Sequence, residues 1–280
     1  MKSTIFLQGG LGNQLFQYAF GRNLEINHNV SVEYSSLLLK LPLDVTPRQL
    51  EIRELVENKL TNKPIKDISS IALNKIFFRN KIVTDKNLNI DFIKENKCDV
   101  IGFFQAYKYI DEIWENEGDR LLSFLKMDKG AQNKTNYLAI HLRLGDYLNS
   151  KKTKRFHGLS APTYFFSAAR KLSYETGIDK FIVVTDSPKE AKNFLRNISK
   201  EGLHFEIVSN NHLDDLKTIY QSRGAILSNS SFSWWGGYLA WKMRDIPIIV
   251  PSPWYYDAKK QPIDLCPEEW MKVDRKFHEE

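Results

Sequence analysis

TIFLQGGLGNQLFQYAF, residues 4–20, runs from a short apolar stretch through a cluster of glycines into a helical pattern. Residues 4–8 predict a buried strand, because apolar and β-branched side chains dominate them. From about Asn13 onward, apolar residues recur at the spacing of one helix face. These residues are Leu15, Phe16, Ala19, Phe20 and Leu24. The stretch therefore predicts a strand, a glycine-rich turn and a helix.

The same alternation continues along the chain and indicates the fold class. We expect further strands at residues 30–34, 99–104, 137–141, 181–185, 205–208, 225–227 and 246–250. Most are separated by segments long enough for a helix, as in parallel sheets covered on both faces. Gly130 and the polar residues 131–136 form the best linker candidate. We therefore predict an α/β protein with two Rossmann-like parallel-sheet domains, residues 1–130 and 131–280, and a ligand site in the cleft between them.

The composition is that of an ordinary globular protein, with 42% hydrophobic and 26% charged residues among 280. Cys98 and Cys266 lie far apart and outside any CxxC pair, which indicates neither a zinc site nor a disulfide framework. The apolar run of residues 5–7 is too short for a signal peptide or a membrane span, which favours a cytoplasmic location. The net charge of +6 favours an acidic partner: a nucleotide-sugar, the inner face of a membrane contacted peripherally, or a nucleic acid.

The glycine-rich turn at residues 9–14 is the first candidate site. At a strand-to-helix junction, the N–H groups near Gly10 and Gly12 can face an anion, although glycines also make tight turns with no ligand. Gly10 and Gly12 together with Glu33 also suggest a dinucleotide site. Leu15 stands where the third glycine of that fingerprint belongs, so the NAD-dependent oxidoreductase remains an alternative with weaker support.

The second candidate is HLRLGDY, residues 141–147, at the end of a predicted strand. Strand alternation places His141, Arg143 and Gly145 on one face. Arg143 can bind phosphate oxygens through two parallel hydrogen bonds, which suits an anionic leaving group. Alternatively, an ion pair between Arg143 and Asp146 stabilises the strand end and has no part in chemistry.

The third candidate is SNSSFSWWGG, residues 228–237, which follows the strand predicted at 225–227. Its serines offer hydroxyl and N–H groups to an anion at the start of a helix. The aromatic residues Phe232, Trp234 and Trp235 suit either a sugar platform or, for the tryptophans more often, the core.

Acidic and basic residues elsewhere give weaker indications. Asp186 can accept hydrogen bonds from a guanine edge or a ribose, and so can Asp214 and Asp215, but helix capping explains all three equally well. The basic run 151–155 is typical of a solvated loop. No two aspartates stand two positions apart, so we expect no metal and no other cofactor.

These motifs, in this order, resemble those of the α-1,2-fucosyltransferases of glycosyltransferase family 11. That family has GGLGNQLFQYA at the start, H-x-R-R-G-D-Y in the middle and SNSSFSWW near the end, and further likenesses extend over nearly the whole chain. The resemblance implies a GT-B fold, with GDP-fucose in the C-terminal domain and the acceptor mainly in the N-terminal domain. The family's second arginine is Leu144 here. Strand alternation points position 144 away from Arg143, so we expect that difference to have a mild effect on donor affinity and not to abolish activity.

The resemblance also implies roles for individual residues in an inverting, metal-independent transfer. Arg143 would contact the β-phosphate, and the general base would be Asp146 or His141. Together with Asp186, which is a candidate from the sequence pattern alone, these residues make up the expected catalytic and donor-binding set. The set is Gly10, Gly12, Asn13, His141, Arg143, Asp146, Asp186, Ser230, Ser231 and Phe232. The expected acceptor is a glycan, often one ending in galactose, either free or linked to lipid. A non-catalytic protein that binds nucleic acid or membrane remains a third alternative, although it leaves the motifs at 141–147 and 228–237 unexplained.

Overall fold

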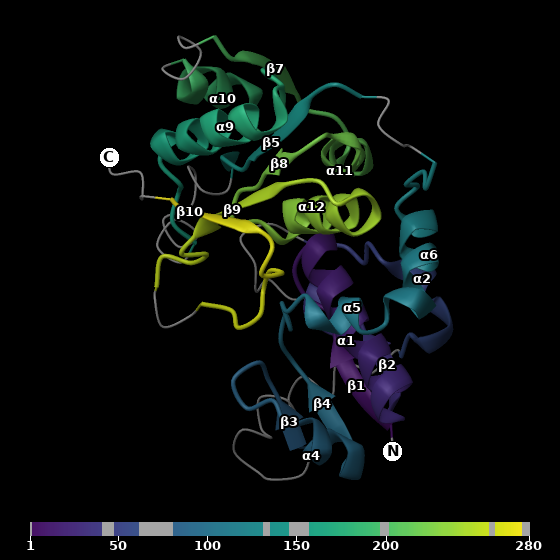
Figure 1. Cartoon of the computed structure of the whole chain (residues 1–280). Coiled ribbons are helices and arrows are strands. Elements are labelled where there is room, and N and C mark those ends of the chain that lie inside the picture. The colour runs from purple at the N-terminus through teal and green to yellow at the C-terminus, as the bar shows by residue number, and fades with distance from the viewer. Residues whose placement is uncertain are drawn as a thin grey trace. The chain divides into compact units, whose positions relative to one another are not determined.

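The computed structural model describes residues 2–40, 48–61, 81–130, 135–145, 157–196, 202–257 and 261–275 (Figure 1). The chain divides into two compact units, Met1–Phe124 and Leu125–Glu280. Each unit contains a parallel sheet with helices packed on it, as the sequence predicted. The two sheets are those of an α/β protein built from Rossmann-like units, and this confirms the predicted fold class.

In the described residues of the first unit, four parallel strands follow the order β2-β1-β4-β3. The helix α1 follows β1 directly and is buried along most of its length. The elements are β1 (Lys2–Phe6), α1 (Leu11–His28), β2 (Ser31–Ser35), η1 (Leu37–Lys40), α2 (Arg53–Val56), η2 (Glu57–Lys59), β3 (Lys81–Val83), α4 (Ile90–Glu95), β4 (Cys98–Val100), α5 (Lys108–Asp111) and α6 (Trp114–Phe124).

The described part of the second unit has six parallel strands in the order β10-β9-β8-β5-β6-β7. Helices α9 and α10 cover one face of this sheet, and α11 and α12 cover the other (Figure 1). The elements are β5 (Leu138–Leu142), α9 (Pro162–Thr176), β6 (Lys180–Thr185), α10 (Pro188–Leu195), β7 (His204–Val208), α11 (His212–Gln221), β8 (Ala225–Ile226), α12 (Ser231–Arg244), β9 (Ile248–Ser252) and β10 (Met271–Asp274).

Helix α12 packs tightly because two adjacent glycines face its neighbours. A Cβ atom on Gly236 would lie 2.9 Å from Ile219 Cγ2, and one on Gly237 would lie 2.8 Å from Leu227 Cδ1. Trp234 and Trp235 are fully buried, and Trp234 Nε1 donates to the carbonyl oxygen of Leu265 at 3.0 Å. The interpretation of these tryptophans as core residues is confirmed.

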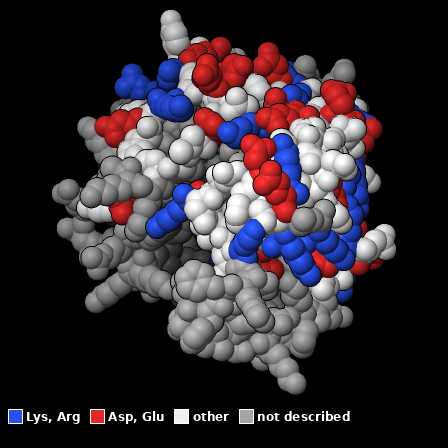
Figure 2. Space-filling view, turned by 90° about the horizontal axis from the view of Figure 1, so that it is seen from below, with Lys and Arg blue, Asp and Glu red and all other residues white. Residues whose placement is uncertain are grey.

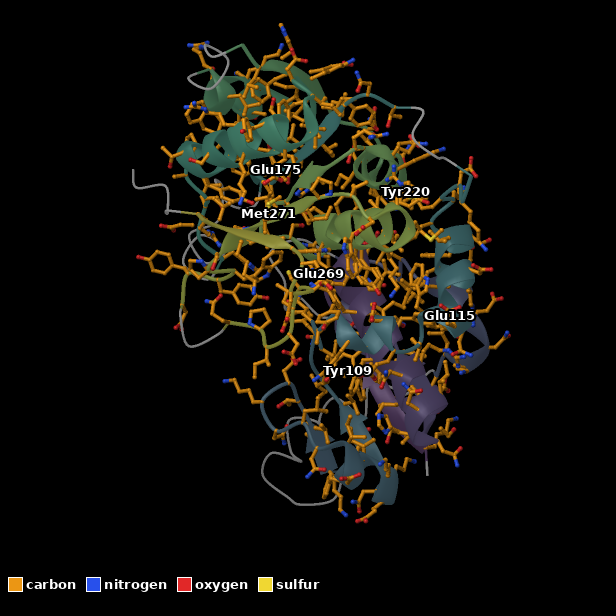
Figure 3. The ribbon with its side chains drawn as sticks, viewed as in Figure 1. Tyr109, Glu115, Glu175, Tyr220, Glu269 and Met271 are labelled. Atoms are coloured by element: carbon orange, nitrogen blue, oxygen red, sulfur yellow. The ribbon has the colours of Figure 1, made fainter. Side chains whose placement is uncertain are left out.

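An apolar cluster also fills the other face of this sheet, the face opposite to α12. Leu138, Ile140 and Leu142 of β5 contribute to it, and Met271 of β10 packs against it (Figure 3). No helix in the described parts of the chain is long and apolar enough to cross a membrane.

Along the chain, the first unit ends at Phe124 and the second begins at Leu125, a few residues before the boundary placed at 130/131 from the sequence. The segment that follows α6 belongs to the second unit because α11 binds it. Tyr220 of α11 donates its hydroxyl hydrogen to the carbonyl oxygen of Asp128 at 3.0 Å (Figure 3). The polar linker candidate 131–136 is described only from Thr135 onward.

Candidate functional site

The strand order of the second unit reverses between β5 and β8, and the motifs at 141–147 and 228–237 both begin there. From β5 the chain proceeds outward through β6 and β7, and from β8 it proceeds in the other direction through β9 and β10. β5 and β8 are parallel neighbours, with Ile140 paired to Ile226. Both motifs therefore leave the sheet at adjacent carboxyl ends, which is where open parallel sheets bind their ligands.

His141 links the two motifs from a buried position. It is 4% exposed, its Nδ1 lies 2.6 Å from the Oγ of Ser228, and its ring lies beside that of Phe232 at 5.7 Å between centroids. Burial, reinforced by the charge of Arg143 and opposed by Asp186, lowers the pKa of His141 to about 3. The ring is therefore neutral near pH 7 and weakly basic, which disfavours the general-base alternative for His141.

Arg143 lies next to Asp186, the residue that follows β6. Arg143 Nε is 3.3 Å from Asp186 Oδ2, and the two side chains are 27% and 33% exposed. Partial burial works against ionisation of Asp186, but the charge of Arg143 and two backbone N–H donors outweigh it and lower the pKa of this carboxyl. Asp186 is therefore a carboxylate at neutral pH and partly balances the guanidinium.

The helix α12 begins beside these residues with a serine-rich turn. Ser230 is the N-cap residue, and its N–H donates to the carbonyl oxygen of Ser228 at 2.8 Å. The Ser233 hydroxyl is buried and donates to the Ser230 carbonyl oxygen at 3.2 Å, whereas Ser231 and Phe232 are half-buried. Because the first N–H groups of a helix have no partner within the helix, this turn can bind an anion.

Asp146, a residue of the predicted site, lies outside the described residues, and so does the basic run 151–155. The predicted ion pair between Arg143 and Asp146 therefore stays a prediction, and the described carboxylate partner of Arg143 is Asp186. Within the described ranges, no group of three His, Cys, Asp or Glu side chains could hold a metal ion.

In the first unit, the glycine-rich turn lies at the corresponding reversal of strand order, between β1 and β4. Gly9 has a positive φ of 75°, and Gly10 is the N-cap of α1. Gln105, just beyond β4, donates from Nε2 to Asn13 Oδ1 at 2.8 Å. The N–H of Leu11 donates to Glu51 Oε1 at 3.0 Å, so a carboxylate of the chain already binds the start of this helix.

Sequence reasoning missed two buried glutamines that build this turn. Gln14 and Gln17 are 0% exposed. Gln14 Nε2 donates to the carbonyl oxygens of Gly9 and Gln49, each at 2.8 Å, and Gln17 Nε2 donates to that of Gly102 at 2.7 Å. The available signal was a pair of amides three positions apart on the apolar face of α1, because buried amides require hydrogen-bond partners.

The acidic residue of the dinucleotide alternative has a structural role. Glu33 accepts a hydrogen bond from the Thr4 hydroxyl at 2.7 Å and forms an ion pair with Lys2 at 2.6 Å. It is the middle residue of β2, where it pairs with Thr4 of β1, and it does not lie at the carboxyl end of β2 as the dinucleotide alternative requires. Basic and acidic side chains lie close together on the described surface shown in Figure 2.

Comparison with known proteins gives one family and two similar bacterial enzymes. The family model described as Glycosyl transferase family 11 matches residues 2–274. An α-1,2-colitosyltransferase of Escherichia coli is 26% identical over 289 residues, which cover 96% of this chain and 98% of that protein. The O-antigen biosynthesis glycosyltransferase WbnK of Escherichia coli is 24% identical over 305 residues, which cover 95% and 99%.

Solved structures that resemble the chain include two glycosyltransferases. A mutant of Arabidopsis thaliana FUT1 in complex with GDP is 10% identical with a TM-score of 0.44, and the match covers 98% of this chain and 77% of that one. The Escherichia coli heptosyltransferase WaaC with ADP-2-deoxy-2-fluoro heptose is 11% identical with a TM-score of 0.40, and the match covers 98% and 93%.

Proposed function

Because this chain belongs to glycosyltransferase family 11, we propose that it transfers L-fucose from GDP-fucose to a glycan hydroxyl and forms an α-1,2 linkage to galactose. One observation supports this proposal most strongly. Arg143 and the start of α12 lie at the carboxyl ends of adjacent strands, where the strand order reverses. A fixed guanidinium beside a helix N-terminus suits the pyrophosphate of a nucleotide-sugar.

Sugar transfer creates negative charge on the leaving pyrophosphate, and the chain offers donors for that charge. Arg143 would contact the β-phosphate, and the turn at Ser230, Ser231 and Phe232 would supply N–H and hydroxyl groups. Donors that are already oriented stabilise the transition state more than the ground state, because the charge on the leaving group grows as the sugar bond breaks.

The acceptor hydroxyl would attack the anomeric carbon on the face opposite GDP, which inverts the configuration. A general base is needed for the proton of that hydroxyl. Since His141 is buried, neutral and weakly basic, we assign this role to Asp146, the carboxylate of the same motif.

The relatives favour a second candidate donor and suggest the kind of acceptor. One relative is named an α-1,2-colitosyltransferase, and colitose is fucose without the hydroxyl group on carbon 3. The other is named an O-antigen biosynthesis glycosyltransferase. The second candidate is therefore transfer of colitose to the same class of acceptor, a repeat unit of a surface polysaccharide.

The test is to incubate the purified protein with GDP-fucose or GDP-colitose and a panel of β-galactoside acceptors, and to assign the new linkage by NMR. An α-1,2-fucoside made faster than the colitoside supports the first candidate, and the reverse order supports the second. The Arg143→Ala variant is the control for background transfer. Absence of transfer from either donor would overturn the proposal.

The rival classes need a separate binding experiment. GDP alone should protect backbone amides around Arg143 and residues 228–232 from hydrogen exchange. Protection by NAD at residues 9–14, with no effect of GDP, would support the oxidoreductase. Salt-sensitive binding of RNA or DNA that GDP does not displace would support a nucleic-acid-binding protein.

A further inference from the structure

Asp186 contacts three consecutive residues of the turn that follows β5. The carboxylate follows β6 directly, and β6 pairs with β5 so that Leu142 is opposite Thr185. Asp186 Oδ1 accepts hydrogen bonds from the N–H groups of Leu144 and Gly145, each at 3.0 Å. Asp186 Oδ2 lies 3.3 Å from Arg143 Nε. One side chain thus binds both the backbone of the turn and the guanidinium that the turn presents.

The contact with Arg143 is made through Nε, which lies on the stem side of the guanidinium group. The two Nη groups extend beyond it and are the pair that binds a phosphate in a two-pronged contact. A free arginine side chain loses conformational entropy when it is fixed in one orientation. An arginine that Asp186 has already oriented loses less of this entropy when the pyrophosphate binds.

Gly145 makes this arrangement sterically possible. A Cβ atom at position 145 would lie 2.9 Å from Asp186 Oδ2 and 3.2 Å from its Cγ. Any other residue at position 145 would therefore press on the carboxylate. The carboxylate of Asp186 therefore occupies space that a side chain at position 145 would need.

We propose that Asp186 is a positioning residue that orients Arg143 toward the leaving pyrophosphate, and that it does not contact the donor sugar or the guanine itself. This inference rests on the role proposed above for Arg143. It differs from the expectation that Asp186 binds guanine or ribose, because both carboxylate oxygens already have partners within the turn.

The decisive variant is Asp186→Asn, which removes the charge and keeps the size. We expect kcat to fall on the order of 10- to 100-fold, because small displacements of a reacting contact have effects of that size. The matched control is Asp179→Asn, which removes a carboxylate immediately before the other end of the same strand, where the side chain is 65% exposed and faces His204. The control should leave kcat unchanged.

A second variant tests the same contact without removing the charge. Gly145→Ala introduces the Cβ atom that would press on Asp186, so it should lower kcat in the same direction while the carboxylate remains. In protein labelled with ¹⁵N-arginine, the Nε–H signal of Arg143 is identified as the one that disappears in the Arg143→Lys variant. In the parent protein, this hydrogen should exchange slowly with solvent. Its exchange should become fast in both Asp186→Asn and Gly145→Ala.

A double-mutant cycle separates positioning from direct donor binding. If Asp186 acts through Arg143, Asp186→Asn should have no further effect on kcat in the Arg143→Ala background. An equal loss in both backgrounds would show that Asp186 contacts the donor and would overturn the inference. An Arg143 Nε–H signal that exchanges rapidly in the parent, or that neither variant changes, would overturn it as well.

The NMR signal also separates this inference from the proposed function. If no tested GDP-sugar is a substrate but the signal responds to both variants, Asp186 still orients Arg143 and only the proposed function fails. The parent measurement needs no variant to fold, so it decides the first step even if the substitutions destabilise the protein.

Discussion

Leu144→Arg, which restores the usual residue of the family, should strongly destabilise the second unit. Leu144 is 1% exposed and belongs to the apolar cluster with Leu142, Leu159 and Phe165. Loss of its burial costs about 1.5–3 kcal/mol. Burying an unpaired guanidinium costs several kcal/mol more. The sum, roughly 5 kcal/mol or more, approaches the whole free energy of unfolding of many domains.

The assay is urea unfolding followed by tryptophan fluorescence, which reports mainly on the second unit because five of the six tryptophans lie there. With a slope of about 1–3 kcal/mol per molar urea, the midpoint should fall by roughly 2 M or more. Leu144→Met is the volume-matched control and should cost less than about 1.5 kcal/mol. If Leu144→Arg unfolds at the same urea concentration as the control, its side chain reaches solvent and the reasoning is wrong.

This prediction concerns stability, and it adds a cost at position 144 to the mild effect on donor affinity that strand alternation predicted. Alternation considers only the direction of the side chain, and Leu144 does leave the site as expected. It enters the core, however, where an arginine has no place unless neighbouring residues change with it.

Three further predictions concern the same site. Arg143→Lys should lower kcat on the order of 100- to 1,000-fold without a change in the unfolding midpoint, because lysine cannot make a two-pronged phosphate contact; an unchanged kcat would favour a purely structural role. The low pKa of His141, caused first by burial and then by Arg143, means that the unfolded state binds the extra proton between about pH 6.5 and pH 3. Stability should therefore fall as the pH is lowered through that window, by up to about 1.4 kcal/mol per pH unit, and His141→Asn should lack this component in urea titrations at several pH values. Transfer should persist in excess EDTA, and complete loss of turnover that magnesium or manganese restores would contradict the metal-independent assignment.

The sequence was sufficient for most of the fold because buried parallel strands are apolar runs of ordinary length. The runs predicted near residues 4–8 and 181–185 are strands within a few positions of where they were expected. β3 and β10 were missed because they are short and partly exposed, with burial patterns that give little apolar signal. Short edge strands of this kind depend on their neighbours for stability, and local sequence does not show those neighbours.

Pairings within the site could not be obtained from the motifs alone. Leu144 and Asp186 are separated by 42 positions, and His141 and Ser228 by 87. Each pair meets because β5 lies between β6 and β8, so the strand order had to be known first. The helix-capping interpretation of Asp186 was therefore as reasonable as the ligand interpretation until β6 was placed beside β5.

The two strand-to-helix turns looked alike in the sequence but differ in what their nearby carboxylates bind. At the start of α1, Glu51 Oε1 accepts a hydrogen bond from the N–H of Leu11, so a side chain already occupies a donor that a phosphate would need, and the guanidinium of Arg48 lies close to the same turn. At the start of α12, the nearby charged pair is Arg143 with Asp186, and Asp186 is engaged by the turn after β5. A phosphate at the first helix would therefore have to displace Glu51 from this N–H group, whereas Asp186 at the second site binds the turn after β5. This difference favours the second unit for the nucleotide, whereas the amide side chains of Asn13 and Gln105 in the first unit can exchange hydrogen bonds with hydroxyl groups.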